Sequence, residues 1–429
     1  MQAKILPNGM CLLNLERYIN DIKSRLRDVA DLENFKAPST PFAGDPVSKK
    51  DCPDIEPGQN KLRKRYVEII GILRWVERCC RPDLSVALSE LGKVQANPSQ
   101  KHFDQLIRCL RYTIATKSLG ILYGRPREDD PEAGLCGFVD SNWGGTSADH
   151  RSRGGYIFMA WGSPICWSSF RATAIALSSC EAEFQAASIA TQQATWCRYL
   201  ASDMGLGDLC ITDYGNLCSR DYRRSCLTMM THQGEVPITI FEDNKAAILL
   251  SENHVFHKRS RSIHARYRYV RQHVRLGHVR LCYVETSRNL ADLMTKTLPS
   301  ATHSKLCDKL LCHLRGDKVY TFSGKLIDGP KRRGKRDEIR FPDLTRYRLI
   351  SPADISDATL EERIREINNF DNWAQRERDA RRGASKPTSR QATASTIATH
   401  TSALSPDHLR LITTACAVWA SAISTTTTG

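Results

Sequence analysis

The sequence lacks the cysteine patterns that are typical of secreted and zinc-binding proteins. It has 16 cysteines, but no CxxC pair, and its N-terminus carries no apolar core of a signal peptide. The evenly spaced Cys210, Cys218 and Cys226 supply neither a fourth ligand nor the tight pairs of a structural zinc site. The pattern favours free thiols in a reducing compartment, and we expect an intracellular protein, in the cytoplasm or the nucleus, that is not secreted.

Long apolar runs are also missing. The most apolar stretch near the C-terminus, residues 411–423, is shorter than the roughly 20 residues that a membrane-spanning helix needs. We therefore expect no membrane partner. The chain also shows no internal repeat.

Acidic residues are in short supply. Lys and Arg number 62 against 47 Asp and Glu, which gives a formal net charge of +15. Such an excess indicates a polyanionic partner, although a solvated basic surface would give the same count.

Composition divides the 429 residues into four regions, within the two or three domains that this length predicts. Residues 1–130 are mixed and contain two apolar helical blocks. Residues 131–300 alternate between strand-like and helix-like runs. Residues 301–382 read as a basic linker followed by a charged helix, and residues 383–429, rich in Ser and Thr, read as a disordered tail.

Residues 131–300 predict a mixed α/β layer fold with five strands. Helices are expected at 178–204, at 244–252 and in a short segment capped by Asn289. The five strands are expected at 134–142, 154–162, 163–170, 236–244 and 277–287, with a tight turn at Gly162-Ser163 between the second and the third.

The stretch LSSCEAEFQA holds two glutamates, Glu181 and Glu183, two positions apart on the longest predicted helix. Residues two apart point about 200° away from each other, so only one of the two can face the sheet. Helical spacing from Glu181 meets mostly polar residues, which places Glu181 on the solvent side. The same spacing from Glu183 meets only small apolar residues: Ala186, Ala187, Ala190 and Ala194.

Glu183 is therefore predicted to face the sheet, where a carboxylate needs a partner. One alternative is a local ion pair with Arg151 or Arg153. The other is a metal site, because Asp140 and Asp243 end predicted strands and Asp292 opens a helix. Four converging carboxylates would repel one another, and their hard oxygen ligands suit Mg²⁺ or Mn²⁺.

These residues lie in stretches that resemble the ribonuclease H domain of copia-type long-terminal-repeat retrotransposon Pol polyproteins. The resemblance is carried by GFVDSNWGG, RSRGGYIFMAWGSPICWSS, ALSSCEAEFQAASIATQQATWCRYLASDMG, TIFEDNKAAILLSENHVFHKRSRSIHARYRYVR and VETSRNLADLMTKTLP. Residues 66–124 are similar to the segment that follows the polymerase palm in the same polyproteins. The likeness covers about residues 9–299.

The resemblance implies an α/β, ribonuclease H-like fold with a mixed five-stranded sheet flanked by helices. A small, mostly helical reverse-transcriptase thumb or connection segment would precede it, and a largely disordered tail would follow. The implied activity is hydrolysis of the RNA strand of RNA–DNA hybrids during reverse transcription. The catalytic and metal-binding residues carried over are Asp140, Glu183, Asp243 and Asp292, which would hold two Mg²⁺ or Mn²⁺ ions and no small-molecule cofactor.

The resemblance also implies the partners: an RNA–DNA hybrid and the remainder of the Pol polyprotein, within a cytoplasmic virus-like particle or the nucleus. The basic run at 254–280 could hold the phosphate backbone, although a solvated helix face is the alternative. The residues assigned to nucleic-acid binding are Lys258, Arg259, Arg261, Arg266, Arg268 and Arg271.

The sequence departs from the family in several places. Asn142 stands where a second Asp is usual, and about 20 extra residues lie between Gly205 and Val236. No Tyr/Phe-Val-Asp-Asp stretch is present, so the chain is expected to lack the polymerase palm and to be the C-terminal part of a polyprotein or a truncated copy. The alternative is a degenerate, inactive copy that at most binds nucleic acid. Neither His264 nor His278, which could assist proton exchange, matches the family pattern.

Overall fold

A computed structural model describes residues 1–6, 10–44, 46–123, 135–144, 150–160, 162–203, 237–252 and 264–327. All of them belong to one of the chain's two compact units, residues 1–336 with 413–429. No disulfide joins the cysteines within these ranges, while the Cys210, Cys218 and Cys226 series lies outside them. No helix in the described ranges has the length and apolarity to cross a bilayer.

The five predicted strands form one mixed sheet with the order β6-β5-β4-β7-β8. β4, β5 and β6 are antiparallel neighbours, whereas β7 runs parallel to both β4 and β8. Gly162, with φ at 72°, makes the predicted tight turn between β5 and β6. The strands are β4 (Cys136–Asn142), β5 (Arg153–Ala160), β6 (Ser163–Arg171), β7 (Ile238–Glu242) and β8 (Val279–Tyr283).

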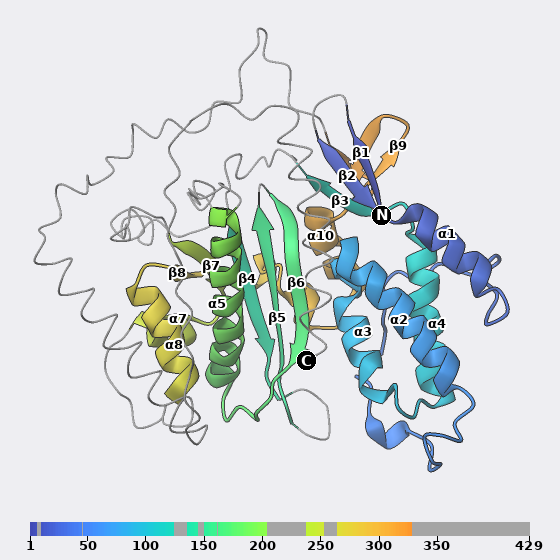
Figure 1. The fold of residues 1–429 in the computed structure, drawn as a ribbon, viewed down its shortest axis with the longest axis horizontal. Helices are drawn as coiled ribbons and strands as arrows, with labels where there is room; N and C mark the ends of the chain where they lie inside the picture. Colours follow the sequence, from blue (N-terminus) through green and yellow to red (C-terminus); the bar gives the residue numbers. More distant parts are fainter. Residues whose placement is uncertain are drawn as a thin grey trace, which may run out of the picture. The chain divides into compact units, whose positions relative to one another are not determined.

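Helix α5 (Ser179–Asp203) lies along β4 and β5, as Figure 1 shows. The predicted stripe is confirmed, because Ala186, Ala190 and Ala194 are buried in a cluster with sheet residues such as Val139. Small side chains on this stripe let the helix axis approach the sheet closely.

The prediction that Glu181 faces solvent is wrong. Its side chain is buried, and Oε2 accepts a hydrogen bond from the backbone N–H of Leu177 at 2.8 Å. Phe184, on the same side of α5, is also buried. A second layer buries Phe184: α7 (Lys245–Glu252) and α8 (His264–Arg275) pack against α5 on the side that helical periodicity marked as polar.

Two adjacent glycines in β5 let elements pack closely on both faces of the sheet. A Cβ on Gly154 would lie 3.3 Å from Cβ of Ala186 in α5. A Cβ on Gly155 would lie 2.4 Å from Cβ of Met294 in the short helix α9 (Asp292–Thr295). Only glycine at 155 therefore allows α9 to lie directly on β5.

The sequence predicted that Asn289 caps a short helix, but Asn289 does not directly precede one. The turn Thr286–Arg288 comes before it, and α9 begins three residues after it, at Asp292. The Asn289 side chain instead accepts the N–H of Ala291 at 3.1 Å and donates to the carbonyl of Val139 at 2.9 Å. Asn289 thereby fixes the chain before α9 onto strand β4.

The N-terminal region contains a sheet as well as the predicted helices. Three strands that the sequence did not predict, β1 (Gln2–Ile5), β2 (Cys11–Asn14) and β3 (Gly120–Tyr123), pair antiparallel. The helices are α1 (Glu16–Arg25), α2 (Arg63–Cys80), α3 (Ser85–Leu91) and α4 (Gln100–Ala115), with 3-10 turns at Lys49–Asp51, Pro82–Leu84 and Gly92–Val94.

The sequence predicted a linker from residue 301, but the structure has a helix and three strands between residues 300 and 327. Residues 300–327 form helix α10 (Ser300–Leu310) and strands β9 (Cys312–Arg315), β10 (Lys318–Thr321) and β11 (Leu326–Ile327). β9 pairs with β3, and this completes a six-stranded sheet with the order β1-β2-β3-β9-β10-β11. The charged helix and the Ser/Thr-rich tail predicted beyond it lie outside the described residues.

Side chains tie the N-terminal region to the five-stranded sheet. Trp167 Nε1 in β6 donates to the Glu77 carboxylate of α2 at 3.2 Å, and the Tyr123 hydroxyl donates to the carbonyl of Pro164 at 3.1 Å. The Ser163 hydroxyl donates to the carbonyl of Leu122 at 2.5 Å. Residues 1–123 and the five-stranded sheet therefore share an interface with specific polar contacts.

Candidate metal centre

Strand register brings two of the predicted carboxylates to the same edge of the sheet. β4 and β7 are parallel, and Phe138 pairs with Phe241, so Asp140, near the end of β4, stands at the same level as Asp243, which directly follows β7. Glu183 reaches this edge from the first turns of α5. One carboxylate oxygen from each of Asp140, Glu183 and Asp243 lies within 4.8 Å of the others.

Asp140 and Glu183 lie where burial disfavours negative charge. Asp140 is 1 % exposed and Glu183 is 7 % exposed. Burial, and then the charges of Asp140 and Asp243, raise the pKa of Glu183 to about 9; burial is also the main cause that raises the pKa of Asp140. Oε2 of Glu183 is buried and accepts no hydrogen bond within the described part of the chain. A divalent cation would satisfy this oxygen and offset the repulsion.

Asp292, the fourth predicted acid, is not part of this three-residue group. It connects to the group through Lys296, whose Nζ lies 2.7 Å from Oδ1 of Asp292 and 3.1 Å from Oδ1 of Asp140. Burial, and then the nearby charge of Asp140, raise the pKa of Asp292 to about 6. The two carboxylates raise the pKa of Lys296 despite its partial burial. The structure therefore places Asp292 beside Asp140, with an ammonium group between them.

The sequence is similar to transposon Pol polyproteins. It is 29% identical over 301 residues to the retrovirus-related Pol polyprotein from transposon TNT 1-94 of Nicotiana tabacum, covering 70% of this chain and 20% of that protein. It is 27% identical over 310 residues to the Pol polyprotein from transposon RE2 of Arabidopsis thaliana, covering 72% of this chain and 18% of that protein. The chain is a homologue of transposon Pol polyproteins.

The Pol homologue thus spans about a fifth of the length of these curated relatives. A third similarity, 34% identity over 131 residues, is to secreted RxLR effector protein 161 of Plasmopara viticola, and covers 30% of this chain and 89% of that protein. No family model matches the chain. No solved structure matches it either.

Two residues that the sequence analysis missed hold Asp140 in place in the Pol homologue. Thr295 donates a hydrogen bond from its hydroxyl to Oδ2 of Asp140, and Lys296 donates to Oδ1. The only sequence signal was the spacing of Lys296, four residues after Asp292, which is the spacing of an ion pair along a helix. Their contact with Asp140 spans about 155 residues and has no local signature.

Glu242 is a further acidic residue that the sequence analysis overlooked. It precedes Asp243 at the end of β7 and is fully buried. Oε1 accepts the N–H of Asn244 at 3.2 Å, while Oε2 has no hydrogen-bond partner among the described residues. Burial, and then the charge of Glu183, raise the pKa of Glu242 well above its ordinary value. The strand-like alternation of ITIFE could have indicated that this side chain points inward.

Arg153, one of the alternatives considered as a local partner for Glu183, pairs instead with Glu90 of α3. His278, considered for proton exchange, lies just before β8, at the end of the sheet opposite Asp243, because β7 and β8 are parallel. The side chain of His264 lies outside the described residues.

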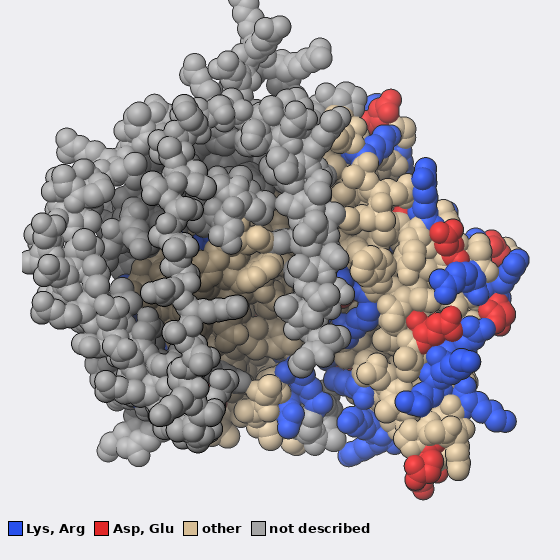
Figure 2. Space-filling model, viewed as in Figure 1, with Lys and Arg blue, Asp and Glu red and all other residues tan. Residues whose placement is uncertain are grey.

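The predicted nucleic-acid-binding run is described only in part. Arg268 is exposed on α8 and Arg271 is half-buried, while the side chain of Arg266 lies outside the described residues, as does the segment 253–263 that contains the other three. Over the N-terminal helices, Figure 2 shows basic and acidic side chains interspersed rather than one basic surface. Ion pairs such as Arg65 with Asp28 account for part of this mixture.

Proposed function

We propose that the Pol homologue is a metal-dependent endonuclease of the ribonuclease H type that hydrolyses the RNA strand of RNA–DNA hybrids. The observation that carries this proposal is the meeting of Asp140, Glu183 and Asp243 within 4.8 Å at one sheet edge. These acids come from segments far apart in the sequence, and each lies in a stretch that resembles the ribonuclease H domain of copia-type elements.

The three clustered carboxylates fit a divalent ion, and we propose that two ions bind at this edge. Asp140, Glu183 and Asp243 would hold them, with Asp292 beside the group, and the unsatisfied Oε2 of Glu183 offers a free ligand position within the described structure. Bound Mg²⁺ or Mn²⁺ would supply the positive charge that stabilises the attacking and leaving oxygens of a phosphodiester.

The protein's own groups prepare this edge for its ligands. Thr295 and Lys296 fix both oxygens of Asp140, so the carboxylate keeps one orientation. Asn289 holds the chain before α9 onto β4 and thereby places Asp292 and Lys296. Burial of Asp140 and Glu183 keeps water away from one side of the group, which strengthens electrostatic interactions there.

An RNA–DNA hybrid is the proposed substrate, and the remainder of a Pol polyprotein is the proposed partner. Arg268 on α8 is an exposed candidate for a phosphate contact, which would position the duplex without reading its sequence. We place this activity inside the cell, in a virus-like particle or in the nucleus, where reverse transcription intermediates occur.

The test uses the full chain, a hybrid labelled on its RNA strand, and Mg²⁺. We expect cleavage by the wild-type protein and a loss of roughly 100-fold or more in Asp243→Asn, which removes one charged metal ligand. Asp104→Asn is the matched control, because Asp104 is exposed on α4 and contacts only Gln100 in the described structure.

Equal cleavage by the wild type and Asp243→Asn would contradict the assignment of Asp243 as a metal ligand. Absence of cleavage from the wild type at any Mg²⁺ or Mn²⁺ concentration would instead support the alternative of a degenerate copy that at most binds nucleic acid.

A further inference from the structure

A pocket of about 420 Å³ opens between the N-terminal region and the carboxylate edge of the five-stranded sheet. It receives residues from α3 and the turn after it, from the ends of β4, β5 and β6, and from the segment at α9. Its lining consists of Pro46, Val86, Glu90, Lys93, Asn142, Trp143, Gly144, Arg151, Arg153, Arg171, Thr295 and Thr297.

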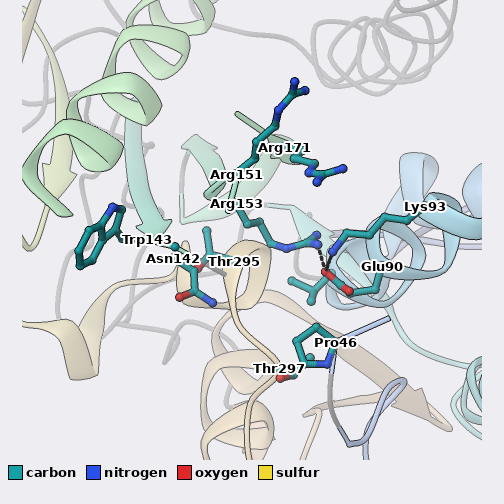
Figure 3. A pocket seen from close by; sticks show the side chains of 12 residues that line it. Pro46, Glu90, Lys93, Asn142, Trp143, Arg151, Arg153, Arg171, Thr295 and Thr297 are labelled. Carbon is teal, nitrogen blue, oxygen red and sulfur yellow. Dashed lines mark hydrogen bonds and ion pairs between the residues drawn. The ribbon is translucent and has the colours of Figure 1, made fainter. Parts of the chain in front are cut away.

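Positive charge dominates this pocket. Four of its lining residues are cationic, Lys93, Arg151, Arg153 and Arg171, whereas Glu90 is the single acidic lining residue. In Figure 3, Arg153 and Lys93 converge on Glu90, and Trp143 lies on the opposite side of the pocket. Lys93 Nζ is 2.7 Å from Oε1 of Glu90, and Arg153 donates to the same oxygen. The Glu90 carboxylate thus pairs with two cations, and Arg151 and Arg171 line the same pocket.

Burial and neighbouring cations lower the pKa of two of these residues. Burial, and then the charge of Arg171, lower the pKa of Lys93 to about 8. Burial, and then the charge of Arg74, lower the pKa of Arg153 to about 10. Among the described lining residues four cations accompany one acid, so the lining favours a bound anion.

The pocket adjoins the candidate metal centre directly. Thr295 lines it and donates a hydrogen bond to Asp140, and Asn142 lines it two residues after Asp140 on β4. A strand whose phosphodiester lies at the carboxylates would carry its neighbouring phosphates past this opening, because successive phosphates along one strand follow at short, regular spacing.

We propose that the pocket binds a phosphate of the nucleic-acid strand that crosses the carboxylate edge, and that Lys93, Arg151 and Arg171 contact that phosphate. Glu90 then acts as the internal counter-anion that holds Arg153 and Lys93 at the pocket when no strand is present. This inference rests on the proposed function for the substrate class. It assigns part of the substrate-binding site to the 3-10 turn Gly92–Val94 that follows α3, outside the segment that resembles ribonuclease H.

The test measures binding of a fluorescein-labelled RNA–DNA hybrid to the full chain by anisotropy, in EDTA, over a series of KCl concentrations. Lys93→Gln and Arg171→Gln are each expected to weaken binding roughly tenfold and to reduce the slope of log K against log salt by about 1, since each removes one phosphate contact. Arg151→Gln, at an exposed position, should act in the same direction without disturbing the core.

Lys101→Gln is the charge-matched control, because Lys101 is exposed on α4 and does not line the pocket. Thermal unfolding verifies that each variant is folded. If Lys93→Gln or Arg171→Gln does not fold, the binding of the exposed variant Arg151→Gln still tests the proposal. If all three pocket variants bind the hybrid with the affinity and salt slope of Lys101→Gln, the inference is wrong.

Inorganic phosphate is the second probe and separates a strand phosphate from a free anion. We expect it to raise the melting temperature much less than the hybrid does, because a lone phosphate is not anchored at the carboxylate edge. An equally large rise with inorganic phosphate would overturn the assignment to a strand. Since cleavage is not the readout, a chain that binds through the pocket without cutting contradicts only the proposed function. If the chain cleaves the hybrid but the three substitutions leave its binding affinity and salt slope unchanged, only the proposed role of the pocket is contradicted.

Discussion

The ammonium nitrogen of Lys296 lies 3.1 Å from a carboxylate oxygen of Asp140, although 156 positions separate the two residues in the chain. The same nitrogen contacts Asp292 at 2.7 Å. In Lys296→Met, both carboxylates lose their cationic partner, and we expect the metal-free protein to lose roughly 1.5–3 kcal/mol of unfolding free energy. Added Mg²⁺ should shrink this difference, because the ion would supply the missing positive charge.

Urea unfolding with and without Mg²⁺ measures both effects of this substitution. Lys305→Met, at an exposed position on α10, is the control and should change stability by less than about 0.5 kcal/mol. A destabilisation of Lys296→Met that Mg²⁺ leaves unchanged would contradict the placement of Lys296 beside a cation site.

The raised pKa of Glu183 predicts a pH dependence of stability in the absence of metal. Its ordinary value of 4.5 rises to about 9 in the fold. Between these values the folded state retains a proton that the unfolded state releases, so the unfolding free energy falls as pH rises. This one group contributes up to about 1.4 kcal/mol per pH unit. We expect denaturant unfolding of Glu183→Gln to show a shallower decline over this window than the wild type.

Divalent ions provide the second arm of the pH experiment. A cation at the carboxylates favours their charged forms, so Mg²⁺ should flatten the decline in the wild type and leave Glu183→Gln little changed. Identical pH profiles for the two proteins in EDTA would count against a protonated Glu183 in the metal-free fold.

Gly155 predicts a steric effect on the site. Its Cβ in Gly155→Ala would meet Met294 at 2.4 Å and Thr295 Cγ2 at 2.9 Å, so α9 must move away from β5. We expect a loss of about 1–3 kcal/mol in stability, together with reduced hybrid cleavage. Gly71→Ala is the matched control, because a Cβ there meets nothing within 4 Å in helix α2, and it should stabilise by about 0.5–1 kcal/mol. Calorimetry and the cleavage assay together test this pair, and equal melting temperatures for both variants would contradict the close packing of α9.

Arg81 and Asp83 form a fully buried pair, joined by two hydrogen bonds of 2.9 and 2.7 Å. Arg81→Met would leave the buried Asp83 carboxylate with the Tyr112 hydroxyl as its hydrogen-bond partner among the described residues, and we expect a loss of about 3–5 kcal/mol. The double variant with Asp83→Leu should lose less, because no buried charge remains. The surface arginine Arg65, changed to Met, should cost less than about 1 kcal/mol. Urea denaturation curves test the order, and a double variant less stable than Arg81→Met would refute it.

Local patterns in the sequence were sufficient for the five-stranded sheet and for part of the site. The alternation of strand-like and helix-like runs predicted β4 to β8, and the alanine stripe after Glu183 predicted which side of α5 faces the sheet. Asp140 and Asp243 were recognisable because each follows a strand-like run. These features depend on hydrophobic periodicities of two and 3.6 residues, which can be recognised within a short window of sequence.

Other features depend on contacts that no local pattern encodes. Phe184, on the same side of α5 as Glu181, is buried because α7 and α8 pack there, and a helical periodicity cannot reveal a second layer. Residues 300–327 appeared to be a linker because their strands are short and because β9 pairs with β3 through Cys312 and Gly120, which are 192 positions apart in the chain. Short strands gain stability from pairing rather than from composition.

The sequence by itself determined which residues can carry the chemistry of this Pol homologue: a set of carboxylates at strand ends and a surplus of basic residues. The tertiary structure alone decided how they combine. It grouped Asp140, Glu183 and Asp243, set Lys296 between Asp140 and Asp292, and joined Glu90 to Arg153 in a basic pocket. The reason is physical: the pKa and the charge balance of a buried group depend on neighbours in space, and folding brings those neighbours from distant parts of the chain.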